Sequence, residues 1–345
     1  MFQPVELTIH FIWLVAGLTL LYFGAEWLVK GASEIALRLG ISPLVVGLTV
    51  VAFGTSMPEL LVCIKANSPE LIAAPAGWLG IDVPPDAPSP DMAFGNIVGS
   101  NIFNIALILG VAALIRPIVI HSQLIRRELP ILIVASLAFV GMMADMTLSR
   151  WEGGLLALGV VVYVIMSVRL AKSEKDTLQF EESTEVVLKQ AEQGGGRLVI
   201  DLLLILVGII ALVFGADWLV DHGESVARVF GVPEVIISLT LFALGTSLPE
   251  LATSVVASIK RQGDIITGNA IGSCIFNLLA VMGVTASVKP LMAEKIAWMD
   301  LWVMLGLAVL IMPFMWSRMS LSRIEGALLT TVAVGYSVLV VMIQR

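Results

Sequence analysis

Charged residues are scarce in this chain of 345 residues. They make up 14 % of it, whereas hydrophobic residues make up 58 % and the mean hydropathy is +0.97. The length alone would suggest two soluble domains, but a composition so poor in charge excludes them. The formal net charge is −7 and no basic arm or patch is present, which argues against nucleic acid as a partner. We therefore expect a protein embedded in a lipid bilayer.

Cysteine and histidine are rarer still. Cys63 and Cys274 lie in apolar stretches and form no CxxC pattern, so we expect buried thiols and no disulfide framework. The three histidines, His10, His121 and His222, lie outside the motifs described below. Soft and borderline metals prefer histidine or cysteine ligands, so this distribution disfavours them as the ions bound there.

Long polar segments are also scarce. A membrane-spanning helix needs roughly 20 apolar residues, and the first apolar stretch lacks the cleavage pattern of a signal peptide, so we expect it to be retained. We predict ten spanning helices, close to residues 7–29, 41–66, 92–115, 129–147, 150–171, 198–216, 232–259, 265–287, 296–316 and 322–342.

The distribution of basic residues predicts the orientation. Ten spans place both termini on one side, and cytoplasmic loops carry an excess of Lys and Arg. If both termini are outside, 14 of the 20 Lys and Arg residues lie on the cytoplasmic side and six lie outside. The six outer residues are Lys65, Arg150, Arg228, Lys289, Lys295 and Arg345. We therefore predict that the N-terminus and the C-terminus are both external, in a bacterial or archaeal plasma (inner) membrane.

The sequence contains an internal repeat. Two motifs recur at an offset of 191 residues and a third at 173: FGAEWLV (23–29) as FGADWLV (214–220), GTSMPEL (54–60) as GTSLPEL (245–251), and GNIVGSNIFN (95–104) as GNAIGSCIFN (268–277). The difference of 18 is an insertion in the first copy, between Asn67 and Asp91. It carries acidic residues and no basic one, so it is either a solvated loop, which the sequence favours, or a mouth that attracts cations.

The repeat predicts the domain organisation. The polar segment 172–197, with GGG at 194–196, has the composition of a flexible cytoplasmic linker. It separates a first five-helix repeat (1–171) from a second (198–345). Because five is odd, the second repeat enters the membrane from the opposite side. The predicted fold is an all-α polytopic membrane protein of two inverted repeats, with a binding site near the bilayer midplane.

Glu59 and Glu250 occupy matching positions within apolar runs. A carboxylate at the centre of a bilayer costs about 2.5 to 3.5 kcal/mol on insertion scales. Two such groups facing each other need a cation between them, or one of them takes up a proton. The sequence therefore predicts a buried cation site. The alternative is a pair of helix-end glutamates that reach the lipid headgroups.

Proline predicts a helix break at the same place in each repeat. Pro58 and Pro249 remove a backbone donor and clash with the carbonyl four residues earlier, so the helix kinks or unwinds at GTS. Freed carbonyls are tolerated at membrane depth only where they line a cavity or bind something. The alternative is an ordinary kink satisfied by Ser and Thr side chains. The hydroxyls that add oxygens at the break belong to Thr55, Ser56, Thr246 and Ser247.

The third and eighth predicted helices carry a polar stripe. Its residues recur at i, i+4 and i+8, which places them on one helical face. The glycines at 95 and 99 and at 268 and 272 allow another helix to approach closely. We expect these helices to press against the broken ones and to add oxygens to the same site. The stripe consists of Asn96, Ser100 and Asn104 in one helix and Asn269, Ser273 and Asn277 in the other.

All of these donors are oxygens. Ca²⁺ takes about 6 to 8 oxygens in a flexible shell, whereas Mg²⁺ demands octahedral geometry and gives up its waters reluctantly. The donor set therefore favours Ca²⁺ as the ion bound at the site.

The paired GTSxPE and GNxxGSxIFN motifs resemble the two α-repeats of the sodium/calcium exchangers of the cation/Ca²⁺ antiporter superfamily, prokaryotic type. The resemblance implies that Glu59 and Glu250 are the central Ca²⁺ ligands, completed by the carbonyls of Thr55 and Thr246. It also implies that the first and sixth helices slide across the rest of the protein. Glu26 and Asp217 lie in those two helices, and we expect them to be helix-end residues rather than gating groups. The Na⁺ sites would be lined by Ser56, Ser100, Asn104, Ser247, Ser273 and Asn277.

The chain departs from many relatives, including K⁺-dependent ones, at two positions. It carries Asn277 where they have Asp and Cys274 where they have Asn. Two central carboxylates balance Ca²⁺ but hold additional monovalent ions less well, so we predict no K⁺ requirement. The short linker also leaves no room for the cytoplasmic Ca²⁺-sensing domains of animal exchangers.

Three functions remain open at this stage. The first is Na⁺/Ca²⁺ antiport by alternating access. The second is antiport of Ca²⁺ or another divalent cation against H⁺, since paired glutamates can carry protons. The third is an intramembrane hydrolase, but no HExxH motif is present. A passive channel is disfavoured, since a double-carboxylate site binds too tightly for fast conduction. We expect no enzyme and no cofactor, Ca²⁺ and Na⁺ as substrates, and a functional monomer.

Overall fold

The computed structural model describes residues 4–68, 90–178, 195–230, 245–293 and 298–343. Helices dominate these residues, and several of them continue into one another: α1 (Pro4–Leu39), α2 (Pro43–Val46), η1 (Gly47–Val51), α3 (Ala52–Thr55), α4 (Met57–Asn67), α6 (Pro90–Phe103), η2 (Asn104–Ile108), α7 (Leu109–Ile115), η3 (Leu124–Glu128), α8 (Leu129–Met142), η4 (Met143–Asp145), α9 (Arg150–Leu178), α11 (Gly195–Val229), α14 (Leu248–Ile259), α15 (Gly263–Phe276), η6 (Asn277–Val281), α16 (Met282–Val288), α17 (Trp298–Arg318) and α18 (Arg323–Ile343). The strands have two residues each: β1 (Ile118–Val119), β2 (Thr147–Leu148), β3 (Leu291–Met292) and β4 (Ser320–Leu321).

The described part of the chain is a multi-span membrane protein. Eight of its helices are long and apolar enough to cross a bilayer, and the bent pair Pro43–Thr55 and Met57–Asn67 makes a ninth. The predicted span 232–259 lies partly outside the described residues, and its described part is 245–259, which includes α14 (Leu248–Ile259). Ten spans therefore stay a prediction.

Helices α1 and α11 are longer than the apolar stretches 7–29 and 198–216 that predicted them. They have 36 and 35 residues, or about 50 Å each at 1.5 Å per residue. A helix that long exceeds the roughly 30 Å of hydrocarbon unless it is strongly tilted or protrudes. Glu26 and Asp217 consequently lie well inside α1 and α11, and the expectation that they are helix-end residues was wrong.

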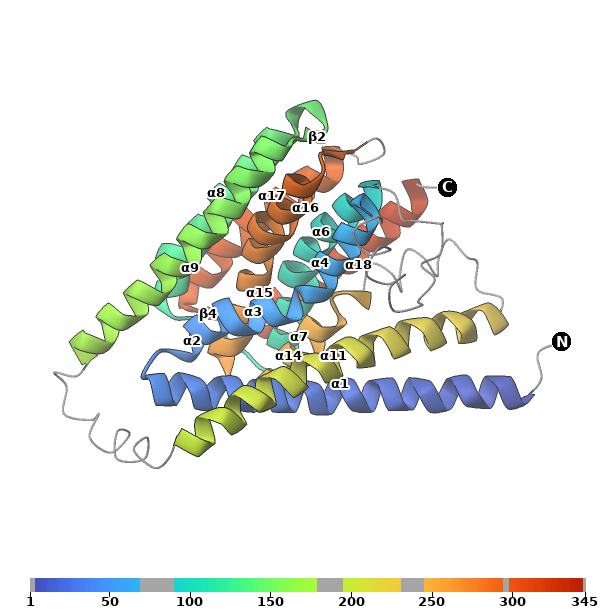
Figure 1. The fold of residues 1–345 in the computed structure, drawn as a ribbon, viewed down its shortest axis with the longest axis horizontal. Helices are drawn as coiled ribbons and strands as arrows, with labels where there is room; N and C mark the ends of the chain where they lie inside the picture. The colour runs from blue at the N-terminus through green and yellow to red at the C-terminus, as the bar shows by residue number, and fades with distance from the viewer. Residues whose placement is uncertain (1–3, 69–89, 179–194, 231–244, 294–297, 344–345) are drawn as a thin grey trace.

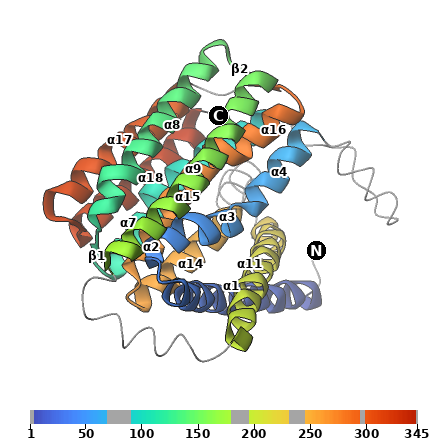
Figure 2. The same ribbon diagram turned by 60° about the vertical axis from the view of Figure 1, so that its left-hand side comes forward.

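Helices α1 and α11 run antiparallel in close contact. A Cβ atom on Gly17 would lie 2.9 Å from the carbonyl oxygen of Gly215, and one on Gly24 would lie 2.9 Å from that of Gly208. Glycine at these positions lets the two backbones touch, as in other small-residue helix pairs. Figures 1 and 2 both place this pair on one side of a bundle formed by the other helices.

The two halves make matching contacts in the bundle. Ile118 of β1 pairs with Leu321 of β4, and Leu148 of β2 pairs with Leu291 of β3. Adding 173 to positions 118 and 148 gives 291 and 321, so each strand pair maps onto the other. Such a pattern, in which a strand of each half pairs with a strand of the other half at equivalent positions, is expected when the two halves are related by a two-fold axis. The inverted order of the halves in the membrane stays a prediction.

Two close contacts between glycines in the bundle are also related by the offset of 173 residues. A Cβ atom on Gly110 would lie 3.0 Å from the carbonyl oxygen of Gly326, and one on Gly283 would lie 3.1 Å from that of Gly153. Positions 110 and 153 become 283 and 326 when 173 is added. The repeat of the sequence therefore extends to the way that its helices pack.

Two predicted segments fall largely outside the described residues. Helix α9 runs to Leu178 and α11 begins at Gly195, so most of the predicted linker 172–197 is not described. Of the insertion between Asn67 and Asp91, residues 69–89 are not described.

Candidate cation-binding site

The helix break in the first half lies at Ser56. This residue has φ −84° and ψ 5° and separates α3 from α4, which are bent by 40°. Ser247, which is 191 residues later, has φ −90° and ψ 4° and precedes α14. In both places a proline follows two residues on, within the first turn of the new helix, where proline lacks no hydrogen bond that the helix needs.

Glu59 and Glu250 lie in the first turns of α4 and α14, and both side chains are completely buried. A helix N-terminus favours a negative charge, but by no more than about 2 kcal/mol. Ser56, three residues before Glu59, has its hydroxyl 3.5 Å from Oε1 of Glu250. The structure thus brings the two predicted acids into one buried site.

Hydroxyl and amide groups of the two halves interlock around these acids. The hydroxyl of Thr55 donates to Oδ1 of Asn269 at 3.1 Å. Its counterpart Thr246 donates to Oδ1 of Asn96 at 2.8 Å. Each broken helix is therefore tied to the polar stripe of the other half.

The serines of the site extend this network. Ser247 donates to the hydroxyl of Ser100 at 3.1 Å. The hydroxyl of Ser273 lies 3.5 Å from Oε1 of Glu250. All ten residues predicted for the site are buried or partly buried, namely Thr55, Ser56, Glu59, Ser100, Asn104, Thr246, Ser247, Glu250, Ser273 and Asn277.

Several polar atoms at the site have no hydrogen-bond partner among the described residues. These atoms include both carboxylate oxygens of Glu59, Oε2 of Glu250, both amide atoms of Asn104 and Oδ1 of Asn277. Neither Glu59 nor Glu250 forms an ion pair with another described residue. Unsatisfied buried polar groups are strongly unfavourable, and buried charges are normally paired or bound to metal. The arrangement is therefore suited to holding cations.

The helices that carry the polar stripe change from α-helical to π-helical geometry at the site. The π-helical turns η2 and η6 begin at Asn104 and Asn277. Such turns are rare and frequently lie at functional sites. The strict α-helical spacing assumed from the sequence therefore ends at these two asparagines.

The close helix approach predicted from the glycines is confirmed in the second half. Cβ atoms on Gly268 and Gly272 would lie 2.7 and 2.8 Å from the carbonyl oxygens of Leu44 and Leu48. Helix α15 thus presses against the backbone just before the break in the first half. The segment that would face Gly95 and Gly99 by the same symmetry lies outside the described residues.

Asn101 is a further polar residue of the site that was not predicted from the sequence. Its Oδ1 accepts a hydrogen bond of 3.2 Å from the amide of Asn277. The matching position in the other half is Cys274, so no repeated motif pointed to it. Asn96 and Asn269 were recognised in the stripe but were not proposed as ligands, and they hold the two threonines.

The site contains oxygen donors and few soft ones. The described residues include no group of three or more His, Cys, Asp and Glu side chains able to hold a metal ion. Cys63 and Cys274 are free and buried, as predicted. Hydroxyl, amide and carbonyl oxygens must therefore supplement the two carboxylates, which is the donor set of a hard cation.

The comparison with known families decides the class of protein. A model of the sodium/calcium exchanger protein family matches residues 9–169 and 200–342. The chain belongs to this family. It is 38 % identical over 335 residues to the putative antiporter CaxA of Alkalimonas amylolytica, which covers 95 % of this chain and 97 % of the relative. It is 30 % identical over 362 residues to the sodium/calcium exchanger MaX1 of Methanosarcina acetivorans, covering 96 % and 98 %.

The fold also matches a solved structure. The sodium–calcium exchanger NCX_Mj, studied without Na⁺ and Ca²⁺, superposes with a TM-score of 0.75 at 26 % identity, covering 95 % of this chain and 97 % of that one. The chain is thus a membrane cation/Ca²⁺ antiporter of an exchanger family. The family is one of transporters, and nothing in it supports the alternative of an intramembrane hydrolase.

Proposed function

We propose that this protein exchanges Na⁺ for Ca²⁺ across the plasma membrane by alternating access, and that Glu59 and Glu250 bind Ca²⁺ together. The supporting observation is a pair of fully buried carboxylates from two halves of the chain, neither of them in an ion pair among the described residues. Two negative charges in an apolar interior require two positive charges nearby. One Ca²⁺ supplies them.

The surrounding oxygens favour Ca²⁺ over Mg²⁺. Besides the carboxylates, the hydroxyls of Ser56 and Ser273 lie at the site, each 3.5 Å from Oε1 of Glu250. In this proposal the carbonyls of Thr55 and Thr246 complete the shell. The carboxylates and the Ser273 hydroxyl come from separate helical segments, namely α4, α14 and α15. Ca²⁺ accepts such an irregular shell of about 6 to 8 oxygens, whereas Mg²⁺ does not.

Na⁺ uses the flanking hydroxyl and amide groups in this proposal. The support for this is that the amide oxygens of Asn104 and Asn277 have no hydrogen-bond partner among the described residues, since a monovalent cation needs oxygen ligands but less formal charge. Binding of Na⁺ there competes with Ca²⁺ for the same carboxylates. The residues assigned to the Na⁺ sites are Ser56, Ser100, Asn104, Ser247, Ser273 and Asn277.

Helices α1 and α11 form the moving part of this mechanism. They pack closely on each other, whereas α1 meets the rest of the protein partly through polar contacts. Nζ of Lys260 lies 3.0 Å from Oε1 of Glu26, and the hydroxyl of Ser33 donates to Gln262 at 2.9 Å. An ion pair as exposed as that of Lys260 and Glu26 contributes only about 0 to 1 kcal/mol, so it can break and reform as the pair of helices slides.

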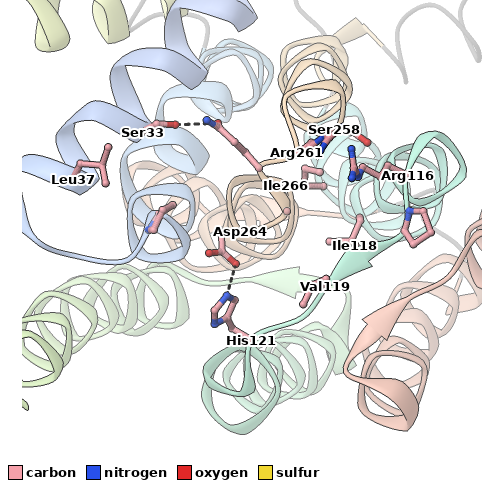
Figure 3. Close-up of a pocket in the computed structure, with 14 residues that line it drawn as sticks. Ser33, Leu37, Arg116, Ile118, Val119, His121, Ser258, Arg261, Asp264 and Ile266 are labelled. Carbon is pink, nitrogen blue, oxygen red and sulfur yellow. Dashed lines mark hydrogen bonds and ion pairs between the residues drawn. The ribbon is translucent and has the colours of Figure 1, made fainter. Parts of the chain in front are cut away.

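A cavity of about 490 Å³ adjoins these contacts. Figure 3 shows Ser33 and Leu37 of α1 on one side of it, with Arg116 and Arg261 on the other and His121 facing Asp264 below. None of the ten residues proposed as ion ligands lines this cavity. It leaves space beside α1 into which that helix can shift.

Transport by purified protein tests the proposal. Proteoliposomes loaded with Na⁺ are diluted into Na⁺-free buffer containing ⁴⁵Ca²⁺ and a protonophore. We expect Ca²⁺ uptake that needs the Na⁺ gradient and survives the protonophore, and its loss in Glu59→Gln and in Glu250→Gln. Glutamine keeps the size of the side chain and removes its charge.

The chain offers matched controls for these substitutions. Glu152 and Glu325 accept hydrogen bonds from the backbone of Ser149 and Ser322 at 2.9 and 2.7 Å, as capping boxes at the starts of α9 and α18. Glutamine serves equally well in a capping box. Glu152→Gln and Glu325→Gln are therefore expected to transport normally. Uptake by the two site variants at the control rate would overturn the proposed site.

Exchange of Ca²⁺ for H⁺ is the second candidate. Both carboxylate oxygens of Glu59 lack a partner among the described residues, and a proton would neutralise that group as a cation does. In this case uptake would follow an imposed pH gradient without Na⁺ and would collapse with the protonophore. The external position of both termini and function as a monomer are part of the proposal and need separate measurements.

A further inference from the structure

Two histidines meet at one end of the α1–α11 pair. The glycines that let these helices touch recur every seven residues, with Gly17 opposite Gly215 and Gly24 opposite Gly208. One heptad beyond Gly17 and Gly215, the positions that face each other are His10 and His222. The close backbone contact therefore brings two imidazole rings from opposite halves of the chain together.

The rings face each other through the same nitrogen atom. Nδ1 of His10 lies 3.0 Å from Nδ1 of His222, and the ring centroids are 5.2 Å apart. Trp13 stacks on His222 with an interplanar angle of 14°, and Trp218 packs edge-on against Trp13 at 4.6 Å. The contacts with Trp13 and Trp218 restrict the orientation of the His222 ring, with its Nδ1 directed toward α1.

Helix packing alone does not require this pair. The repeat places position 31 at the site equivalent to His222, and position 201 at the one equivalent to His10. There the small Gly31 lies against the backbone of Asp201, and the Asp201 carboxylate accepts a hydrogen bond of 2.5 Å from Arg38. The same helix geometry is thus achieved at the other end of the pair with no imidazole.

The two nitrogens have the geometry of a chelate. In the metal-free state one shared proton lies between them, with one ring donating and the other accepting. When a metal ion binds, the donating Nδ1 gives up this proton, either to water from an imidazolium ring or to Nε2 of the same ring by a change of tautomer. Both Nδ1 lone pairs then point at one position. In tetrahedral Zn²⁺ sites the metal–nitrogen distance of about 2.0 to 2.1 Å places two imidazole nitrogens about 3.4 Å apart. A small rotation of either side chain opens the observed 3.0 Å to that value.

We propose that His10 and His222 form a binding site for one divalent transition-metal ion, such as Zn²⁺ or Ni²⁺, which bridges α1 and α11. Neutral imidazole is a preferred ligand of these borderline ions and a poor one for Ca²⁺ and Na⁺. The site is thus chemically distinct from the oxygen-lined one and independent of the transport proposal. Water completes the coordination shell.

Zinc binding to the full-length protein, purified on an affinity tag free of histidine, tests this site. Binding is measured by titration calorimetry with Ca²⁺ in excess, so that the acidic site is occupied. We expect one Zn²⁺ per chain. His10→Ala and His222→Ala should each weaken binding at least about tenfold, which is 1.4 kcal/mol.

His121→Ala is the matched control. His121 is the third histidine of the chain and lies 3.3 Å from Asp264, at the cavity beside α15. This variant should bind Zn²⁺ as the wild type does. Equal loss in all three histidine variants, or undiminished binding in the double variant of His10 and His222, would overturn the proposal.

A second measurement needs only the wild type and does not depend on the folding of a variant. Cu²⁺ added at one equivalent should give an electron paramagnetic resonance spectrum with superhyperfine splitting from two nitrogens. Zn²⁺ should also raise the melting temperature, because the ion binds the folded state. A Cu²⁺ spectrum without nitrogen coupling would show that the two rings form a hydrogen-bonded tie and no metal site.

Discussion

The two halves of the cation site carry the same motif in unequal surroundings. Glu250 has two hydroxyl groups, those of Ser56 and Ser273, at 3.5 Å from its Oε1. Glu59 has no hydrogen-bond partner for either oxygen among the described residues. The hydroxyls that correspond to Ser56 and Ser273 in the other half, those of Ser247 and Ser100, bond to each other at 3.1 Å.

This difference shows how a duplicated site becomes asymmetric. Among the described residues, Glu250 has two hydroxyl groups at hydrogen-bond distance from one of its oxygens, and Glu59 has none. Glu59 should therefore respond more strongly to which ion is bound, while Glu250 provides a fixed point. The following predictions test this contrast, from the largest effect to the smallest.

Removal of either charge should have the largest effect. Breaking one partner of a buried charge pair costs about 3 to 5 kcal/mol, so Glu59→Gln and Glu250→Gln should each weaken Ca²⁺ binding about 100-fold or more. In buffer without Ca²⁺ and Na⁺, Glu59→Gln should raise the melting temperature more than Glu250→Gln, since it removes the less compensated charge. Calorimetry and thermal melting measure the two effects. An equal shift of both melting temperatures would refute the asymmetry.

Removal of the hydroxyls should have an intermediate effect. Ser56→Ala and Ser273→Ala each delete a contact to the Glu250 carboxylate and should weaken Ca²⁺ binding about fivefold, or about 1 kcal/mol. Ser247→Ala and Ser100→Ala delete a hydrogen bond between two hydroxyls and should change Ca²⁺ binding less. Titration of the four variants side by side measures the contrast. A larger loss in the second pair would reverse our assignment of the fixed carboxylate.

The contact between α1 and the end of α14 should have a smaller effect. Glu26 and Lys260 are 35 % and 32 % exposed, and ion pairs so exposed contribute about 0 to 1 kcal/mol. Glu26→Gln should therefore change the rate of Na⁺-driven Ca²⁺ uptake by no more than about fivefold. Asp217, its counterpart, forms no ion pair in the described part of the chain, so Asp217→Asn should change the rate even less. A complete loss of uptake in either variant would make that residue a direct part of the ion path.

Replacement of K⁺ should have no effect. Asn277 is neutral, and the centre of the site contains two carboxylates. Na⁺-driven Ca²⁺ uptake should therefore be unchanged when K⁺ is replaced by choline on both sides of the membrane. Strict dependence on K⁺ would require a monovalent site that these residues do not explain.

Much of the fold was predictable because hydrophobicity and repetition are properties of the sequence itself. The apolar stretches predicted the spanning helices, and the duplicated GTSxPE motifs predicted a bend that the structure shows at Ser56. The lengths of α1 and α11 were not predictable in this way. Their polar ends, which include Arg38 and Asp201, are stabilised by a contact between two helices far apart in sequence.

The site was predictable where both copies of the repeat preserve it. Glu59 and Glu250 were found because they occupy matching positions, and the structure brings both into one buried site. Asn101 was missed because its counterpart is Cys274. The partners of Glu26 and His10 were also missed, since Lys260 and His222 lie more than 200 residues away and no local pattern encodes such pairings.

The most direct test of the shared Ca²⁺ site is a structure determined with Sr²⁺, whose anomalous scattering locates the ion. Our account predicts one Sr²⁺ between the carboxylates of Glu59 and Glu250, with oxygens of both residues at about the 2.3 to 2.6 Å typical of Ca²⁺ shells. An ion bound by only one of the two carboxylates, or carboxylates that face each other with no ion between them at saturating Sr²⁺, would contradict it.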